Sequence, residues 1–139
     1  MEKITIETTI HQSLNRVWDA YNLPDHVVHW NFASDDWYCP KATNEFLVGG
    51  KFNYRMEAKD GSVGFDFVGI YDDIIIHEKM AYHMEDGRQV IVLFQKQNSD
   101  THVRVIFDSE DENPIELQKM GWQSILDQFK KYSESLSNR

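Results

Sequence analysis

The sequence predicts an α+β fold in which a strongly curved antiparallel β-sheet wraps around a long C-terminal helix. Polar and apolar residues alternate in successive runs from residue 46 to residue 108, separated by turn-forming pairs such as Asp60-Gly61. This pattern is typical of antiparallel strands joined by short turns. Apolar residues between 115 and 136 recur at spacings of three and four, which predicts one amphipathic helix. Only the sheet is large enough to cover the apolar face of that helix.

The N-terminal segment predicts a strand followed by a helix. Residues 3–10, KITIETTI, alternate as a half-buried strand does, and we expect this strand to pair with the last strands of the sheet. Ser13 is placed to cap a helix over residues 13–23. The apolar face of this helix consists of Leu14, Val17, Trp18 and Tyr21.

A second short helix and a loop are predicted next. Pro24 suits the first turn of a helix over residues 24–30, PDHVVHW, because proline is tolerated where no backbone N–H is needed. Residues 31–45 show no periodicity and carry Asp, Ser, Asn and Pro, which favours a loop.

Glycines and acidic pairs divide the strand region into runs of about 8–12 residues, longer than most strands. The predicted turns are Gly49-Gly50, Asp60-Gly61, Asp72-Asp73, Asp86-Gly87 and residues 98–100. Gly64 and Gly69 fall inside one run, where glycine indicates a bulge or a sharp bend, so we expect the sheet to curl strongly.

The last helix has its own start signal. The acidic run 108–112, DSEDE, is predicted to be a solvated turn. Asn113, Pro114 and Glu116 then match an N-cap, a first helical proline and a capping-box acid.

Composition and charge narrow the function classes. The chain of 139 residues has the size of one domain, and we expect a single domain over 1–139. Its net charge of −9, with scattered basic residues, disfavours nucleic acid and anionic membranes as partners. The single cysteine, Cys39, excludes an intramolecular disulfide, and no signal peptide or membrane span is expected. We therefore expect a cytoplasmic protein.

The residues give no pattern for catalysis or for a cofactor. His26 and His29 lie three apart near Asp25, but without a third ligand at a defined spacing we interpret them as a solvated helix face. Cys39 has no base that the sequence places beside it, which favours a structural thiol. We predict no catalytic residue, no metal and no cofactor.

Charged residues in the strand region alternate with the apolar ones. Arg55, Glu57 and Asp66 fall on the face opposite the large apolar side chains, so we expect them to form cross-strand ion pairs in water. His83 and His102 lie in strand patterns and are expected at the surface.

Four stretches resemble a known superfamily: "ITIETTIHQSLNRVWDAYNLPDHVVHW", "VGGKFNYRM", "FVGIYDDIIIHEKMAYHM" and "MGWQSILDQFKKY". They are similar to START-related (SRPBCC) proteins, which include polyketide cyclases, birch-pollen-allergen-like proteins and lipid-transfer domains. Within this group the chain resembles the activator of heat-shock protein 90 ATPase homologue-like branch. The resemblance covers nearly the whole chain. It implies a helix-grip fold, with two short helices after the first strand.

The resemblance also implies a hydrophobic cavity between the curved sheet and the last helix. Alternation along each strand then selects the side chains that point inward. The expected ligand-binding residues are Phe52, Tyr54, Met56, Phe65, Phe67, Tyr82, Met84, Val92, Phe94, Val105 and Phe107 on the sheet, Trp122, Ile125, Leu126 and Phe129 on the helix, and Trp30 and Trp37 at the mouth. The alternative is that these side chains fill the space completely, as in any core.

Two functions remain open at this point. The first is binding of a small hydrophobic or aromatic molecule, with cyclase-like catalysis ranked below it because no acid or base is expected inside the cavity. The second is a protein-interaction module related to chaperone ATPase activators. The eukaryotic activators carry an additional N-terminal domain, and the resemblance does not include it. We therefore do not expect a chaperone partner. A homodimer and a lid role for residues 31–45 are left open.

Overall fold

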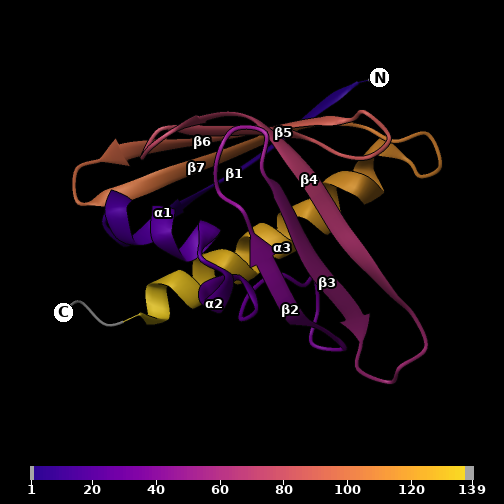
Figure 1. Ribbon diagram of the computed structural model, residues 1–139. Helices are drawn as coiled ribbons and strands as arrows, with labels where there is room; N and C mark the ends of the chain where they lie inside the picture. Colours follow the sequence, from indigo (N-terminus) through magenta and orange to yellow (C-terminus); the bar gives the residue numbers. More distant parts are fainter. Residues whose placement is uncertain (1, 137–139) are drawn as a thin grey trace.

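The protein folds as a seven-stranded antiparallel sheet that curls around one long helix, as the sequence predicted (Figure 1). The computed structural model describes residues 2–136. The elements in chain order are β1 (Lys3–Ile10), α1 (Leu14–Asn22), α2 (Pro24–Val27), β2 (Trp37–Asn44), β3 (Lys51–Ala58), β4 (Gly64–Ile75), β5 (Lys79–His83), β6 (Gln89–Gln97), β7 (Asp100–Asp108) and α3 (Ile115–Ser135). The two short helices follow the first strand, so the α+β, helix-grip prediction is confirmed.

The sheet order is β1-β7-β6-β5-β4-β3-β2, which makes β1 and β2 the edge strands. β1 pairs with β7 along its whole length, from Lys3 opposite Asp108 to Ile10 opposite Thr101. The prediction that the first strand closes against the last ones is therefore confirmed. Ser13 also caps α1 as predicted, since its side chain accepts a hydrogen bond from the Arg16 backbone N–H.

The prediction of a loop over 31–45 was wrong for β2, which spans Trp37–Asn44 and pairs with β3. The sequence pattern did not indicate this strand because it contains Pro40, and proline has no backbone N–H to donate to a neighbouring strand. It is tolerated here because β2 is an edge strand and its register shifts between Tyr38 and Lys41.

The turn predicted at Asp72-Asp73 lies instead inside β4, at a register shift between Tyr71 and Asp73. Asp72 contacts the His83 ring at 2.8 Å, so this acidic residue faces a cross-strand partner rather than a turn. The β4–β5 connection comes later, where His77 adopts a positive φ of 66°.

The start of α3 also differs from the prediction. Pro114, not Asn113, is the N-cap residue, and no side chain caps the helix. Asn113 is used differently: its backbone carbonyl accepts a hydrogen bond from Gln118 Nε2 at 2.8 Å. The Asn113 backbone N–H donates a hydrogen bond to Glu110 Oε1 at 2.8 Å.

The acidic run before α3 is not wholly solvated, because its first two residues, Asp108 and Ser109, are buried. Lys3 Nζ lies 2.6 Å from Asp108 Oδ1, and the Gln89 backbone N–H donates to Asp108 Oδ2 at 2.9 Å. These two hydrogen bonds lower the pKa of Asp108, which explains how a carboxylate tolerates this position.

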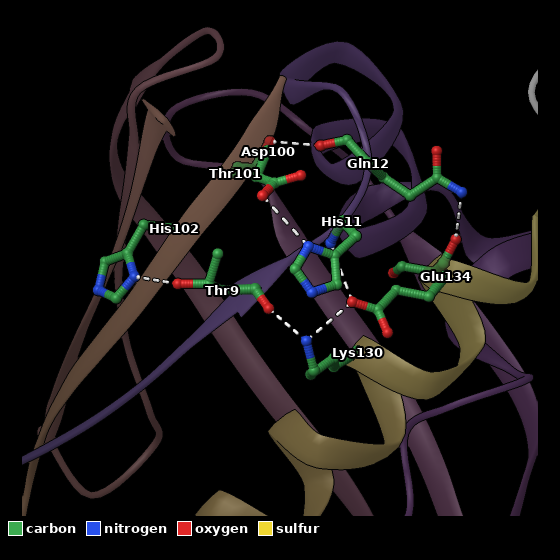
Figure 2. A network of polar contacts seen from close by, with 9 residues as sticks. Thr9, His11, Gln12, Asp100, Thr101, His102, Lys130 and Glu134 are labelled. Carbon is green, nitrogen blue, oxygen red and sulfur yellow. Dashed lines mark hydrogen bonds and ion pairs between the residues drawn. The ribbon is translucent and has the colours of Figure 1, made fainter. Parts of the chain in front are cut away.

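Polar contacts fasten the C-terminal half of α3 to the end of β1 (Figure 2). Gln12 Nε2 donates to the carbonyls of Ser133 at 2.9 Å and Leu136 at 2.8 Å. Lys130 Nζ donates to the Thr9 carbonyl and contacts Glu134 Oε2 at 2.8 Å. We call Gln12, Lys130 and Glu134, with their partners, the polar clasp.

Glu134 is the charged centre of the polar clasp, because it also accepts the His11 backbone N–H at 2.9 Å. Partial burial acts to raise the pKa of Glu134, but the hydrogen bonds from Lys130 and His11 outweigh it and leave this pKa below its ordinary value. The ionised form is therefore the one that holds the helix.

Gly69 in β4 allows close ring packing, and it pairs with Phe52 without a register shift, so no bulge lies at this residue. A Cβ at this position would lie 2.3 Å from Phe52 Cε2 and 2.8 Å from Tyr82 Cδ2. Only glycine lets the Phe52 ring approach the strand this closely.

Within residues 2–136, no helix combines the length and the apolarity that crossing a membrane requires.

Gly69→Ala should lower the free energy of unfolding by about 1–3 kcal/mol, because the methyl group forces the Phe52 ring out of its position. Gly121→Ala is the matched control, since a Cβ there meets nothing within 4 Å and the residue lies inside α3. It should stabilise the protein by roughly 0.5–1 kcal/mol. Urea denaturation midpoints measure both. Equal effects of the two substitutions would contradict the packing role of Gly69.

Glu134→Gln should lower the free energy of unfolding at pH 7 by about 1 kcal/mol and should flatten its decrease in acid. The folded-state pKa of Glu134 is lowered, so its contribution is present above the ordinary carboxyl pKa and is lost as pH falls through the folded-state value. Thermal unfolding between pH 3 and 7 measures this. Glu112→Gln, at an exposed carboxylate outside the polar clasp, should leave the profile unchanged.

Candidate functional site

A cavity of about 450 Å³ lies between the concave face of the sheet and α3. Its wall comes from β1, β3, β4, β5, β7, α1 and α3, from the turn between β5 and β6, and from Trp30 and Asn31 after α2. Phe65, which is 47% exposed, also lines it, so the cavity reaches solvent beside β4. The space is therefore not filled completely by side chains.

The structure brings most of the expected ligand-binding residues onto this wall. These are Trp30, Phe52, Tyr54, Met56, Phe65, Phe67, Tyr82, Met84, Val105, Trp122, Ile125 and Leu126. Their role toward a ligand stays a prediction.

The other expected residues do not line the cavity. These are Trp37, Val92, Phe94, Phe107 and Phe129. Other rings cover the three phenylalanines.

Phe94 packs edge-on against Trp18 at 4.9 Å between ring centroids, and Phe129 packs against Trp30 at 4.8 Å. Phe107 lies under Trp122, with the two rings stacked at 4.0 Å and 9°. Strand alternation gives the inward face, but it does not say which inward residues a helix then covers.

Phe52 is the centre of the aromatic wall. Its ring centroid lies 4.7 Å from that of Tyr54, 4.8 Å from that of Tyr82 and 5.6 Å from that of Phe67. Trp122 contacts Phe67 edge-on from α3 at 6.1 Å. These contacts hold the rings in fixed orientations around the open volume.

Four tyrosines line the cavity: Tyr21, Tyr54, Tyr71 and Tyr82. Burial raises the pKa of all four phenols, and that of Tyr71 reaches about 12. The phenols stay protonated at neutral pH and present O–H donors.

Asn31 and Cys39 lie together beside the cavity. Asn31 is 4% exposed and its Nδ2 is buried without a hydrogen-bond partner among the described residues. Burial raises the pKa of the Cys39 thiol, and the nearby Asn31 amide offsets part of this rise without meeting hydrogen-bond geometry. A protonated buried thiol is a poor nucleophile.

The charged residues of the wall are Asp66, Glu85, Asp86 and Arg88. Arg88 Nε contacts Asp86 Oδ2 at 2.7 Å, and Asp66 lies 3.6 Å from Arg55 on the outer face. The Arg55–Asp66 pair joins β3 to β4 as predicted, whereas Arg55 contacts Glu57 at 2.9 Å along β3 itself, so Glu57 forms no cross-strand pair with Arg55. Charge therefore gathers at the solvent end of the cavity.

His26 and His29 both contact Tyr132 of α3. The His26 ring is 2.5 Å from the Tyr132 hydroxyl, and the His29 ring stacks on Tyr132 at 5.5 Å. Within residues 2–136, no three His, Cys, Asp or Glu side chains are grouped so that they could hold a metal ion.

Sequence reasoning missed several wall residues: Ile6, Tyr21, Asn31, Val68, Tyr71, Met80 and the charged residues of the rim. Tyr71 and Met80 share the parity of Phe67 and Tyr82, so extending the alternation would have found them. Tyr21 was placed on an apolar helix face without assignment to the cavity. Asn31 carried no signal, because its segment lacks any period.

The curled sheet, the gripped helix and the cavity between them define a START-related helix-grip protein. A family model described as "Activator of Hsp90 ATPase homolog 1-like protein" matches residues 11–134. The chain belongs to this family, as the resemblance of its sequence motifs indicated.

Solved structures support the same assignment. The AHSA1-like protein from Aeromonas hydrophila is 39% identical, with a TM-score of 0.90 over 99% of each chain. Chr148 from Cytophaga hutchinsonii is 42% identical, with a TM-score of 0.83 over 95% of this chain and 92% of its own. The Aha1 dimer from Colwellia psychrerythraea, at 14% identity, has a TM-score of 0.75 over 97% and 98% of the chains and shows likeness of fold alone. Among curated proteins, none matches this chain.

The buried tyrosines should make the protein less stable in alkali. Their folded-state pKa values lie above the ordinary value near 10, so their contribution is complete below about pH 10 and is lost as pH rises, by up to about 1.4 kcal/mol per pH unit for each phenol. Urea unfolding between pH 8 and 11 measures this slope. Tyr82→Phe should reduce it. A variant profile that parallels the wild type would contradict the raised pKa of Tyr82.

Proposed function

We propose that the protein binds a small hydrophobic or aromatic molecule in the cavity between the sheet and α3. The supporting observation is an open volume of about 450 Å³, walled mainly by aromatic rings, aliphatic side chains and thioethers. Ligand sites in proteins commonly have this size and lining. An apolar cavity without an occupant costs stability, which a ligand recovers when it binds.

Burial of apolar surface supplies the affinity, at about 25 cal/mol per Å² removed from water. Phe52, Phe67 and Trp122 offer flat surfaces that suit a planar ligand. Met56, Met80 and Met84 are flexible and adapt to its outline.

Binding is favoured over catalysis in the same cavity. A general base needs a pKa near the working pH. The buried phenols have raised pKa values, and the carboxylates of the wall gather at the solvent end. The family's name refers to chaperone activation, but the open aromatic cavity points to a small molecule.

Ile125→Trp tests this proposal, because the indole would occupy part of the cavity from α3. Fluorescence titration with N-phenyl-1-naphthylamine, an uncharged aromatic probe, should show at least roughly tenfold weaker binding, which corresponds to about 1.4 kcal/mol. Leu117→Trp is the matched control, since Leu117 lies on α3, is 54% exposed and does not line the cavity. It should bind the probe as the wild type does.

Native mass spectrometry of protein purified from its source complements the titration. A retained small-molecule mass that Ile125→Trp loses would support the proposal. If the wild type binds no probe, or if both tryptophan variants weaken binding equally, the cavity is not the binding site.

A further inference from the structure

The cavity carries a cluster of hydroxyl groups in its otherwise apolar wall. Tyr21 comes from α1, Tyr54 from β3, Tyr71 from β4 and Tyr82 from β5. The ring centroids of Tyr71 and Tyr82 lie 6.4 Å apart, and Tyr54 and Tyr71 share Asn44 as a hydrogen-bond partner. Four different elements thus deliver hydroxyl groups to the wall of one cavity.

Two of these hydroxyls are satisfied within the protein. Tyr71 donates to Asn44 Oδ1 at 2.9 Å, and Asn44 Nδ2 donates to the Tyr54 hydroxyl at 3.3 Å and to the Asn22 carbonyl at 2.9 Å. Asn44 is the last residue of β2, and it therefore connects this pair of tyrosines to the end of α1.

The hydroxyls of Tyr21 and Tyr82 have no hydrogen-bond partner in the part of the chain that the structure describes, residues 2–136. Tyr82 is only 5% exposed, and the Tyr21 ring is enclosed by Trp30, Phe94 and Phe129. Asn31 Nδ2 also lacks a hydrogen-bond partner among the described residues, but it is fully buried beside the Cys39 thiol and does not face the open volume. Both tyrosines line the cavity, so these two hydroxyls are available to donate to a molecule that occupies it.

We infer that Tyr21 and Tyr82 form the polar end of the cavity, and that its ligand is an uncharged molecule whose carbonyl oxygen, or an equivalent acceptor, receives their hydrogen bonds. This inference rests on the proposed function and names the chemical class of the ligand.

The charges of the wall favour an uncharged acceptor over an anion. Arg88 is the single cationic side chain on the described wall, and it is paired with Asp86 at 2.7 Å. A carboxylate at the polar end would lose its hydration without gaining a counter-ion, which is costly. A pure hydrocarbon would bury the donors and leave them unpaired. A carbonyl oxygen avoids both costs, because it carries no net charge and accepts two hydrogen bonds.

The test compares 2-acetylnaphthalene with 2-ethylnaphthalene, which have similar shapes and differ at the carbonyl. NMR titrations of the wild type and of the Tyr21→Phe/Tyr82→Phe double variant give the dissociation constants. The double variant should bind the ketone roughly tenfold more weakly and the hydrocarbon equally well, since two donors are lost while the rings remain. Tyr38→Phe, at a 39% exposed tyrosine off the wall, should change neither constant.

A second measurement does not depend on any variant. The carbonyl stretch of ¹³C-labelled 2-acetylnaphthalene should move to lower frequency when the wild type binds it, because the oxygen accepts hydrogen bonds. 2-Naphthoate, the anionic probe, should bind more weakly than the ketone.

Three results would overturn the inference alone: equal weakening of ketone and hydrocarbon in the double variant, an unshifted carbonyl stretch, or tighter binding of 2-naphthoate. Failure of the wild type to bind either naphthalene would instead overturn the proposed function, and the inference with it.

Discussion

The architecture depends on how α3 is fixed against the curved sheet at two separate places. Near its C-terminal end, the polar clasp joins Lys130 and Glu134 to the end of β1. Nearer its N-terminal end, Trp122 stacks on Phe107 of β7 at 4.0 Å. Because both ends are held, the helix does not settle further into the sheet, and the segment between them need not fill every gap. A helix held only by apolar packing would slide toward closure of the cavity, since interiors favour close packing.

The stiffness of the wall has the same consequence. Phe52 contacts several rings at centroid distances of 4.7–5.6 Å, and Gly69 gives its ring room to lie against β4. Aromatic rings fixed by one another cannot collapse into an adjacent space as flexible aliphatic chains do, and the cost of a cavity depends on such collapse. Met56, Met80 and Met84 lie among these rings, and only this part of the cavity wall can change its shape easily. The site combines a rigid shape with local adaptability.

The sequence predicted the fold class, the closure of β1 against the late strands and the inward parity of most strands, because these follow from hydrophobic periodicity and from turn chemistry. It failed where tertiary context overrides a local signal. Pro40 suggested a loop, yet an edge position made it compatible with β2. Asp72 suggested a turn, but a cross-strand histidine gave it a place inside β4. For the site, periodicity identified the strand residues that point inward, but not which of them are covered by helix residues. Phe94 and Phe107 were therefore predicted to line the cavity, although Trp18 packs on Phe94 and Trp122 packs on Phe107.

The polar end of the cavity was the part least accessible to sequence reasoning, and it carries the most functional information. Phe52 and Phe67 show that a plain phenyl ring suffices to build this wall. The hydroxyl of Tyr82 is therefore not needed to build the wall, and no protein acceptor within residues 2–136 receives its hydrogen bond. The same holds for the Tyr21 hydroxyl, which also lines the cavity and has no hydrogen-bond partner in the described chain. Local inconsistencies of this kind are expected where a protein is built for something besides its own stability. Both unpaired hydroxyls line the same open volume, so one bound molecule can accept hydrogen bonds from both.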